Sequence, residues 1–237
     1  MKDKRYQRQE GISGWDSEAQ SSLENATVFI AGLGGLGNPV SMYLAAAGIG
    51  CLRICDNDRV ELSNLNRQIL YTENDIGRPK TDCTIKRISE FNSITKLESL
   101  TASINEENIG NLAGNADILV DCLDNKDTRD VLNRFAVENK LPLVHAGVNG
   151  LSGQLSFIHS PETPCMNCIY QDLKEVGPVS VLGAVAGTIG ALQALEVIKY
   201  FTGTGDLLKN RLLIMDGGSM TFHETQIDKK PDCQVCS

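Results

Sequence analysis

"TVFIAGLGGLGNPVSMYLAAAG", residues 27–48, is the stretch that decides the fold of this 237-residue chain. The apolar run at 27–32 contains β-branched residues and predicts a buried strand, and the segment after the glycines predicts a helix. Between them, "GLGGLG" fits the pattern G-x-G-x-x-G through Gly32, Gly34 and Gly37. Glycines at such a turn let backbone N–H groups and the helix N-terminus approach a phosphate. The stretch therefore predicts a nucleotide-binding unit.

The same alternation of strand and helix continues along the chain. Strand patterns recur at 51–56, 117–124 and 141–147, and helical patterns lie at 79–92 and 126–139. Strands that alternate with helices form a parallel, doubly wound sheet, whose ligands bind at the carboxyl ends of the strands. We therefore predict an α/β, Rossmann-like fold.

The last third of the chain has a different pattern. No helix pattern separates the strand-like run at 153–160 from its predecessor, and another strand-rich stretch lies at 211–227. We expect antiparallel additions there, which make the sheet mixed. The apolar segment at 179–201 is interrupted by Gln193 and Glu196 and falls short of a clean membrane span, so it predicts a buried helix.

Composition limits the partners and the compartment. The net charge of −8 and the lack of a basic run argue against nucleic acid as the main partner, because phosphate backbones demand clustered Lys and Arg. The first residues lack the apolar core of a secretory signal, and no membrane anchor is expected. We therefore expect a cytoplasmic protein with reduced cysteines.

Four of the eight cysteines form two C-x-x-C pairs, Cys165 with Cys168 and Cys233 with Cys236. One such pair can be a redox couple, but two pairs in a reducing compartment supply the four thiolates of a closed, tetrahedral zinc site. We therefore predict a structural Zn²⁺. The remaining cysteines read as small buried side chains: Cys51, Cys55, Cys83 and Cys122.

Charged residues follow the predicted strands. Asp56 lies at a distance from the glycine loop that suits a ribose, and Arg67 and Lys80 follow it. Asp124 ends the next predicted strand in the segment "DCLDN". Cations near phosphates neutralise developing charge, and a strand-end carboxylate suits Mg²⁺. Singly, Arg67, Lys80 and Asp124 each read more readily as a surface charge or a helix cap than as a catalyst, but together with the glycine loop they predict phosphate chemistry.

Two other interpretations of the glycine loop are weighed against this one. A tight turn without a ligand would need the same glycines. An NAD-dependent dehydrogenase would need an acid/base residue at the hydride site, and His145 ends a predicted strand. A lone histidine is more often structural, and a melting experiment with ATP and NAD separates the two cofactors.

Eight segments in order resemble one family, the ubiquitin-activating-enzyme-like adenylyltransferases of the MoeB, ThiF and HesA group. They are "RYQRQ" (5–9), "GLGGLG" (32–37), "DNDRVELSNLNRQ" (56–68), "GRPK" (77–80), "DCLDN" (121–125), "PCMNC" (164–168), "GTIGALQALEVIK" (187–199) and "PDCQVC" (231–236). The resemblance covers nearly the whole chain. We expect one ThiF-type domain over 1–237, with a helical arm at 1–24, a zinc hook and crossover loop at 161–180 and a zinc-binding tail at 229–237.

The resemblance implies which residues bind ATP and catalyse the reaction. Gly35 would lie near the phosphates and Asp56 on the ribose. The residues expected around the triphosphate and its Mg²⁺ are Ser63, Asn64, Asn66, Arg67, Lys80, Asp124 and Asn125. Arg8 matches an arginine that reaches into the partner subunit's site, which implies a homodimer. The implied catalytic set is Arg8, Arg67, Lys80 and Asp124.

The implied reaction is the ATP-dependent adenylation of the C-terminal Gly-Gly carboxylate of a ubiquitin-like sulfur-carrier protein. The products are an acyl-adenylate and pyrophosphate. The carboxylate is already ionised, so positioning and charge neutralisation carry the rate, and no general base is required. The sequence leaves the carrier and the pathway open, with molybdopterin, thiamine and cysteine synthesis as the candidates.

One departure from the family bears on sulfur transfer. Some relatives carry a reactive cysteine in the stretch that corresponds to 169–183, which has none here, and we expect no C-terminal rhodanese-like domain. We therefore do not expect a sulfur step of this chain. The alternative substrate is a peptide or tRNA-borne carboxylate, with the acidic charge arguing against tRNA. A non-catalytic nucleotide-binding partner is the third possibility, against which the intact charged set argues.

Overall fold

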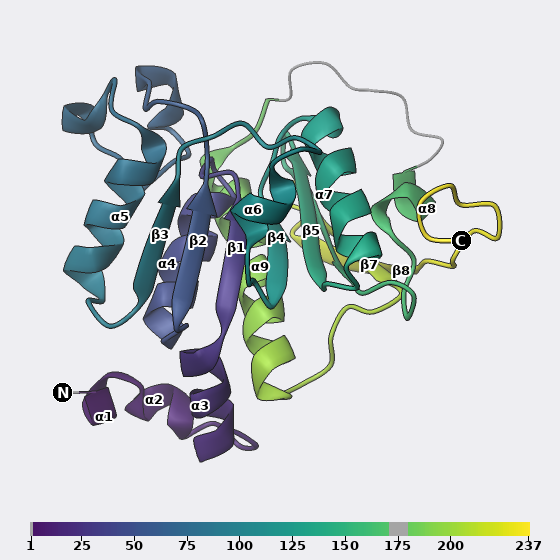
Figure 1. Ribbon diagram of the computed structural model, residues 1–237, viewed down its shortest axis with the longest axis horizontal. Coiled ribbons are helices and arrows are strands. Elements are labelled where there is room, and N and C mark those ends of the chain that lie inside the picture. The colour runs from purple at the N-terminus through teal and green to yellow at the C-terminus, as the bar shows by residue number, and fades with distance from the viewer. Residues whose placement is uncertain (1, 171–179) are drawn as a thin grey trace.

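The computed structural model describes residues 2–170 and 180–237. Residues 171–179, which include most of the predicted crossover loop, lie outside the described residues. Within the described part, one sheet has eight strands in the order β3-β2-β1-β4-β5-β6-β7-β8. Helices cover both of its faces (Figure 1).

The first five strands are parallel and follow the predicted strand–helix alternation. At the centre, β1 (Thr27–Ala31) pairs with β2 (Cys51–Cys55) on one side and with β4 (Ile118–Asp121) on the other. Beyond them, β3 (Lys96–Leu100) forms the edge next to β2, and β5 (Leu143–Asn149) pairs with β4. The sequence pattern did not predict β3.

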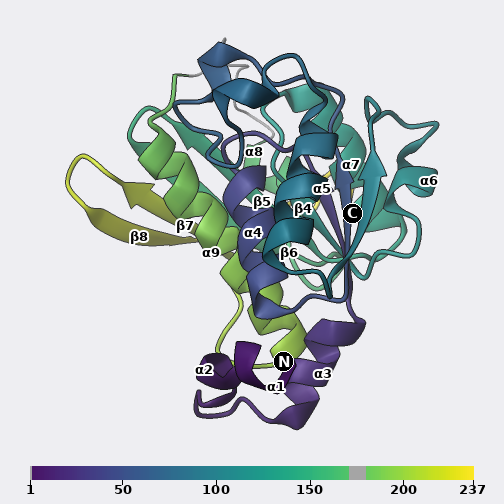
Figure 2. The same ribbon diagram turned by 90° about the vertical axis from the view of Figure 1, so that its left-hand side faces the viewer.

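The last three strands are antiparallel, as expected. The strand β6 (Ser152–Ile158) folds back on β5, and β7 (Arg211–Asp216) and β8 (Thr221–Gln226) form a hairpin beside it. This hairpin projects from the body of the molecule in Figure 2. The predicted mixed sheet is therefore confirmed.

Alternating side chains of the strands fill two separate cores, because successive residues point to opposite faces of a sheet. On one face, Val28 and Ile30 are buried with residues of α4 (Gly37–Ala47), α5 (Lys80–Phe91) and α9 (Gly183–Thr202). None of the helices that the structure describes has the length and apolar character needed to cross a membrane. The apolar segment at 179–201 is instead used as α9, which packs against α4 and the sheet.

The opposite face is covered by a second set of helices. There, Phe29 and Ala31 are buried with residues of α6 (Ile109–Ala113) and α7 (Lys126–Glu138). The cysteines of the predicted zinc site belong to this second core, together with the short helix α8 (Met166–Tyr170).

The N-terminal segment forms three short helices at the end of the sheet where the parallel strands begin (Figure 2). They are α1 (Lys2–Arg5), α2 (Gln7–Glu10) and α3 (Ser17–Asn25). Buried Tyr6 anchors this arm, since its hydroxyl accepts a hydrogen bond from Asn92 Nδ2 at 3.2 Å. The arm therefore lies far from the carboxyl ends of the strands.

Candidate nucleotide site and cysteine cluster

A cavity of about 430 Å³ lies where β1, β2 and β4 end. These carboxyl ends meet because Ala31 pairs in register with Cys55 of β2 and with Asp121 of β4. The loops that follow the three strands line the cavity. Its volume falls within the range of small-molecule sites, which is about 300–1,000 Å³.

The glycine loop after β1 makes a turn so tight that two of its positions, 32 and 37, have no room for a side chain. Gly32 has a φ of +93°, and a Cβ there would lie 2.7 Å from the carbonyl oxygen of Cys122. A Cβ on Gly37 would collide with the carbonyl oxygen of Gly32. The first and last glycines of the motif thus set the tight turn that brings the N-terminus of α4 to the cavity.

Asp56, the predicted ribose ligand, lies directly after β2 and lines the cavity. Its Oδ2 accepts a hydrogen bond from the backbone N–H of Leu33 at 2.7 Å, and Oδ1 accepts one from Asp58 N at 2.8 Å. Its carboxylate therefore also fastens the glycine loop to the end of β2. The oxygens keep free lone pairs, because each can accept a second hydrogen bond.

Buried hydrogen bonds hold the segment after Arg67 against the glycine loop. The fully buried Asn38 donates from Nδ2 to the carbonyl of Leu33 at 2.8 Å and accepts from Leu70 N at 2.9 Å. Tyr71 donates its hydroxyl hydrogen to the same Leu33 carbonyl at 2.9 Å. These buried hydrogen bonds hold Leu70 and Tyr71 against the glycine loop. Arg67, three residues before Leu70, is thereby held beside the loop and lines the cavity.

Lys80 is the first residue of α5 and lines the cavity, although it is only 4% exposed. Its Nζ lies 2.7 Å from Oδ2 of Asp58. A cation at a helix N-terminus is disfavoured by the helix dipole, so helix stability does not explain this lysine. Residues that break a local rule in this way are expected at functional sites.

The loop after β4 supplies the opposite wall. Asp124 is exposed there, and Asn125 caps α7 by accepting a hydrogen bond from Thr128 N at 3.0 Å. From the first turn of α7, Arg129 donates through Nη2 to the carbonyl oxygens of Leu123 at 2.5 Å and Ala146 at 2.9 Å. The loop that carries Asp124 is therefore tightly held.

Charges of both signs line the cavity. The carboxylates are Asp56, Asp58 and Asp124, and the cations are Arg67, Lys80 and Arg129. Carboxylates suit a hard cation such as Mg²⁺, and the cations suit phosphate oxygens. The donor set thus fits a magnesium–nucleotide complex.

Most of the predicted nucleotide residues come together here. The lining includes Gly35, Asp56, Asn64, Arg67, Lys80, Asp124 and Asn125. Ser63 and Asn66 lie on the same turn but outside the lining: Ser63 Oγ bonds Glu61 at 3.2 Å, and Asn66 Oδ1 accepts from Arg67 at 3.1 Å. Arg8 is exposed on α2, away from the cavity of its own chain.

The sequence interpretation assigned no role to three further lining residues, Asp58, Gln68 and Arg129. Gln68 is 3% exposed, and its Oε1 has no hydrogen-bond partner among the described residues. Asp58 and Gln68 lie within the quoted motif, and Arg129 lies four residues after Asn125 on the helix that follows it. The sequence could have indicated Asp58 and Gln68 by their place within the motif, and Arg129 by its place on the first turn of the helix that follows Asn125.

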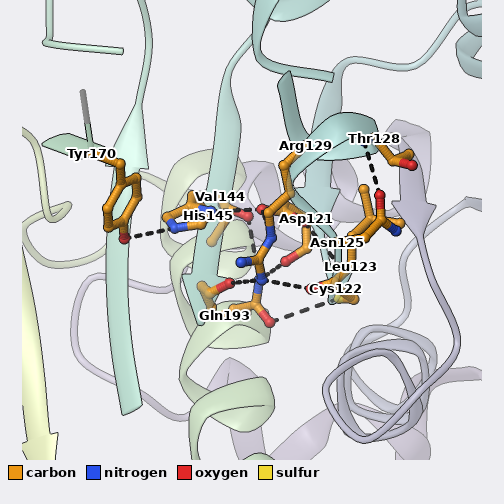
Figure 3. Close-up of polar contacts among 11 residues, drawn as sticks. Asp121, Cys122, Leu123, Asn125, Thr128, Arg129, Val144, His145, Tyr170 and Gln193 are labelled. Atoms are coloured by element: carbon orange, nitrogen blue, oxygen red, sulfur yellow. Dashed lines mark hydrogen bonds and ion pairs between the residues drawn. The ribbon is translucent and has the colours of Figure 1, made fainter. Parts of the chain in front are cut away.

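Beside the cavity, the buried side chains of Asp121 and His145 lie in contact (Figure 3). Asp121 Oδ2 lies 2.6 Å from His145 Nδ1 and 3.2 Å from Arg129 Nε. Burial opposes ionisation of Asp121, but Arg129 and His145 outweigh it and hold the pKa of the carboxyl below its ordinary value. His145 does not line the cavity, so it has no position for the acid/base role of a dehydrogenase.

Cys122 reaches the cavity from the end of β4, but its thiol is buried. Burial raises the pKa of this thiol well above its ordinary value, and the neighbouring Asp121 carboxylate raises it further. The prediction that Cys51, Cys55 and Cys83 are also buried is confirmed.

The four predicted zinc ligands form one buried group, called here the four-cysteine cluster: Cys165, Cys168, Cys233 and Cys236. Their sulfur atoms all lie within 4.8 Å of one another, and the closest pairs across the tail are 3.6 and 3.5 Å apart. Tetrahedral Zn–S bonds of about 2.3 Å require sulfurs about 3.8 Å apart. The cluster therefore fits a zinc ion.

Comparisons with known proteins agree with this site. The sequence model of the ThiF family matches residues 6–235. The adenylyltransferase and sulfurtransferase MOCS3 of Drosophila ananassae is 41% identical over 240 residues, which cover 98% of this chain and 53% of that protein. MOCS3 of Culex quinquefasciatus is 39% identical over 98% of this chain and 55% of that protein. The chain thus spans about half the length of the curated relatives it matches.

Solved structures give the same result. The crystal structure of E. coli MccB with ATP superimposes with a TM-score of 0.88 at 28% identity, covering 99% of this chain and 74% of that chain. MccB with MccA-N7isoASN gives a TM-score of 0.89 at 26% identity, over 100% and 75% of the two chains. At the level of the family, these matches bear out the predicted class of adenylyltransferases. The chain belongs to the ThiF family.

Proposed function

We propose that this protein is an ATP-dependent adenylyltransferase that activates the C-terminal Gly-Gly carboxylate of a ubiquitin-like sulfur-carrier protein. The observation that carries this proposal is the cavity in which the glycine loop faces Arg67 and Lys80 on one side and Asp124 on the other. Relatives named adenylyltransferase, and the similarity to MccB solved with ATP, support it.

The ribose and the phosphates of ATP then each have residues to bind them. Asp56 takes the ribose, and the backbone at Gly35 lies against the phosphates. Arg67 and Lys80 neutralise the phosphate charge, while Asp124 and Asn125 complete the site on the opposite wall. Ser63 and Asn66, on the turn beside the lining, reach the triphosphate after side-chain rotation.

The reaction is a displacement at the α-phosphorus of ATP. A carboxylate oxygen of the carrier forms a bond to this phosphorus, and the bond to the bridging oxygen of pyrophosphate breaks, with its electron pair leaving on pyrophosphate. Mg²⁺, held by Asp124, would supply charge neutralisation of the phosphates. The cationic side chains of Arg67 and Lys80 orient the phosphates and stabilise the charge that develops.

Arg8 serves the partner's site in this proposal. Gln9, the next residue of α2, donates to the carbonyl of Ala47 at 2.7 Å, at the C-terminal end of α4. The other end of α4 is the glycine loop, and eleven residues of helix span about 16 Å. Arg8 therefore lies a helix length from its own cavity, and only a second copy of the chain can bring it to one.

The four-cysteine cluster is proposed to hold a structural zinc ion, since its four ligands leave no position open for substrate. A cytoplasmic location is part of the proposal, because a reducing compartment keeps the four thiols of a zinc site from forming disulfides. A second candidate acceptor is the carboxylate of a small peptide. The similarity to MccB, which has been solved with MccA, supports this alternative.

The test is ATP–pyrophosphate exchange with three acceptors: the intact carrier, the carrier lacking its Gly-Gly, and a peptide with its C-terminal sequence. We expect exchange with the intact carrier alone. Asp124→Ala should lower it by roughly a hundredfold, as losses of charge stabilisation commonly do. Asp127→Ala, an exposed aspartate on the first turn of α7, is the matched control and should retain activity. Exchange supported by the peptide but not the carrier would reverse the choice of substrate.

A further inference from the structure

A row of buried hydrogen bonds joins the four-cysteine cluster to the loop that carries Asp124. Tyr170 Oη lies 2.8 Å from His145 Nε2, and His145 Nδ1 lies 2.6 Å from Asp121 Oδ2 (Figure 3). The three side chains come from α8, β5 and β4, so the row runs from the helix that contains Cys168 across two neighbouring strands toward the cavity.

The direction of each hydrogen bond follows from the donors and acceptors. An ionised carboxylate only accepts, so His145 must donate its Nδ1–H to Asp121. A neutral imidazole that donates from Nδ1 accepts at Nε2, and Tyr170 then donates its hydroxyl hydrogen. Burial lowers the pKa of His145, which keeps the ring neutral as this arrangement requires.

The far end of the row fixes the backbone one residue before Asp124. Asp121 Oδ1 accepts from Leu123 N at 3.0 Å, and Arg129 donates to the carbonyl of Leu123 at 2.5 Å. Arg129 is itself paired with Asp121. Both polar groups of Leu123 therefore depend on the position of the Asp121 carboxylate.

The near end of the row is part of the metal-binding helix. Tyr170 is the last residue of α8 and lies two residues after Cys168. At the other end of α8, Met166 N donates to Asn133 of α7 at 3.0 Å. A five-residue helix has little stability of its own, so its position depends on these contacts and on a metal held by the cysteines.

We infer that Tyr170 and His145 are positioning residues that couple metal binding at the four-cysteine cluster to nucleotide binding at the cavity. A metal ion holds α8 where the Tyr170 hydroxyl reaches His145, and His145 orients the carboxylate that shapes the Asp124 loop. Linkage between binding free energies is reciprocal, so if the metal strengthens nucleotide binding, the nucleotide must strengthen metal binding by the same factor. This inference rests on the proposed binding of ATP in the cavity.

The test measures the zinc affinity of the protein by equilibrium competition with a chromogenic chelator, with and without saturating MgATP. In the wild type, we expect MgATP to raise the zinc affinity by roughly fivefold or more, which is the lower end of typical coupling between sites. Tyr170→Phe removes only the hydroxyl, and the increase should fall below about twofold. Tyr200→Phe changes a half-buried tyrosine that packs on Phe157, and it should behave as the wild type does.

His145→Asn provides a second variant. Its side-chain amide still donates to Asp121, so no buried carboxylate is left unpaired, but it offers no acceptor in reach of Tyr170. It should lose the effect of MgATP as Tyr170→Phe does. If this variant fails to fold, the comparison of Tyr170→Phe with Tyr200→Phe is sufficient to test the coupling.

Calorimetric titration of each protein with MgATP separates the possible failures. If the wild type binds MgATP but its zinc affinity is unchanged, or if Tyr170→Phe keeps the full effect, the coupling is wrong and the proposed activity stands. If MgATP does not bind the wild type, both proposals are wrong. The coupling is also supported if the affinity for MgATP is weaker in Tyr170→Phe and His145→Asn but unchanged in Tyr200→Phe. Such a result would show that the row of side chains affects nucleotide binding as well as metal binding.

Discussion

Lys80 and Asp58 form an ion pair in the lining of the candidate ATP cavity, with Nζ 2.7 Å from Oδ2. The lysine side chain is 5% exposed and the aspartate side chain 60%. The buried partner is thus the cation, and in the proposed site it is held in place for a phosphate before any nucleotide arrives. Preorganised charge of this kind costs no reorganisation during the reaction.

Lys80→Ala should therefore lower ATP–pyrophosphate exchange by roughly a hundredfold, because it removes a preorganised cation. Asp58→Asn leaves the lysine charged but free to move, and its loss should be smaller, on the order of tenfold, as expected for one long side chain that must be ordered on binding. Asp82→Asn, an exposed change on the first turn of α5, is the control. A larger loss from Asp58→Asn than from Lys80→Ala would make the carboxylate the principal group.

Zinc should be present at about one ion per chain, because four thiolates saturate a tetrahedral site. Cys233→Ser should lower the zinc content and loosen the tail, whereas Cys51→Ser, in a strand outside the cluster, should leave the zinc content unchanged. Metal analysis of protein purified without chelators measures both. A zinc-free protein with four accessible thiols would contradict the prediction.

Arg8 should act across a dimer. After mixing and subunit exchange of Arg8→Ala with Asp124→Ala, half of the dimers are mixed, and each has both defects in one site. We expect recovery of about a quarter of the wild-type activity, since one site in each mixed dimer is intact. A mixture of Lys80→Ala with Asp124→Ala has no intact site and is the control. Lack of recovery despite demonstrated subunit exchange would reject donation in trans.

No thioester with the carrier is expected. A thioester needs an accessible thiolate, but burial keeps the pKa of the Cys122 thiol high, and this cysteine lines the cavity only from beneath the loop. Enzyme, carrier and MgATP should give no carrier-shifted band on a non-reducing gel. A shifted band that reductant removes, and that Cys122→Ala abolishes, would assign a covalent step to this residue.

Stability should decrease with falling pH because of His145. Its folded pKa lies below the ordinary value near 6.5, chiefly because it is buried. Just below pH 6.5 the unfolded chain therefore binds a proton that the folded protein does not, and the free energy of unfolding falls as the pH falls. Urea unfolding at about pH 7.5 and about pH 6 should show a smaller loss for His145→Asn than for the wild type or His223→Asn. Equal losses in all three proteins would exclude His145 as the source.

The sequence predicted those parts of the molecule that depend on local pattern. Apolar runs marked the central strands, and the glycines and C-x-x-C pairs marked their sites, because each needs particular residues at fixed spacing. The edge strand β3 escaped prediction, since "KLESL" (96–100) has two polar residues between its leucines and includes neither an apolar run nor a strict alternation. Its cross-strand ion pair between Glu98 and Arg53 depends on the register of the sheet.

The buried row of polar groups escaped prediction for a related reason. Asp121, His145 and Tyr170 lie in three separate segments, and only the pairing of β4 with β5 and the docking of α8 bring them together. Nothing in their spacing distinguishes them from unrelated polar residues. The same holds for Asn38, whose partners Leu33 and Leu70 lie on either side of it in sequence.

The four-cysteine cluster also imposes an order on biosynthesis. A nascent chain presents Cys165, just before α8, and Cys168, within it, well before Cys233 and Cys236 have been translated. Until then only half of the cluster exists, although every strand of the parallel part has already been made. If the cluster holds the proposed zinc ion, the ion is captured only after translation passes residue 236, and a product cut short before the second pair would keep the parallel strands but lack two of the four ligands.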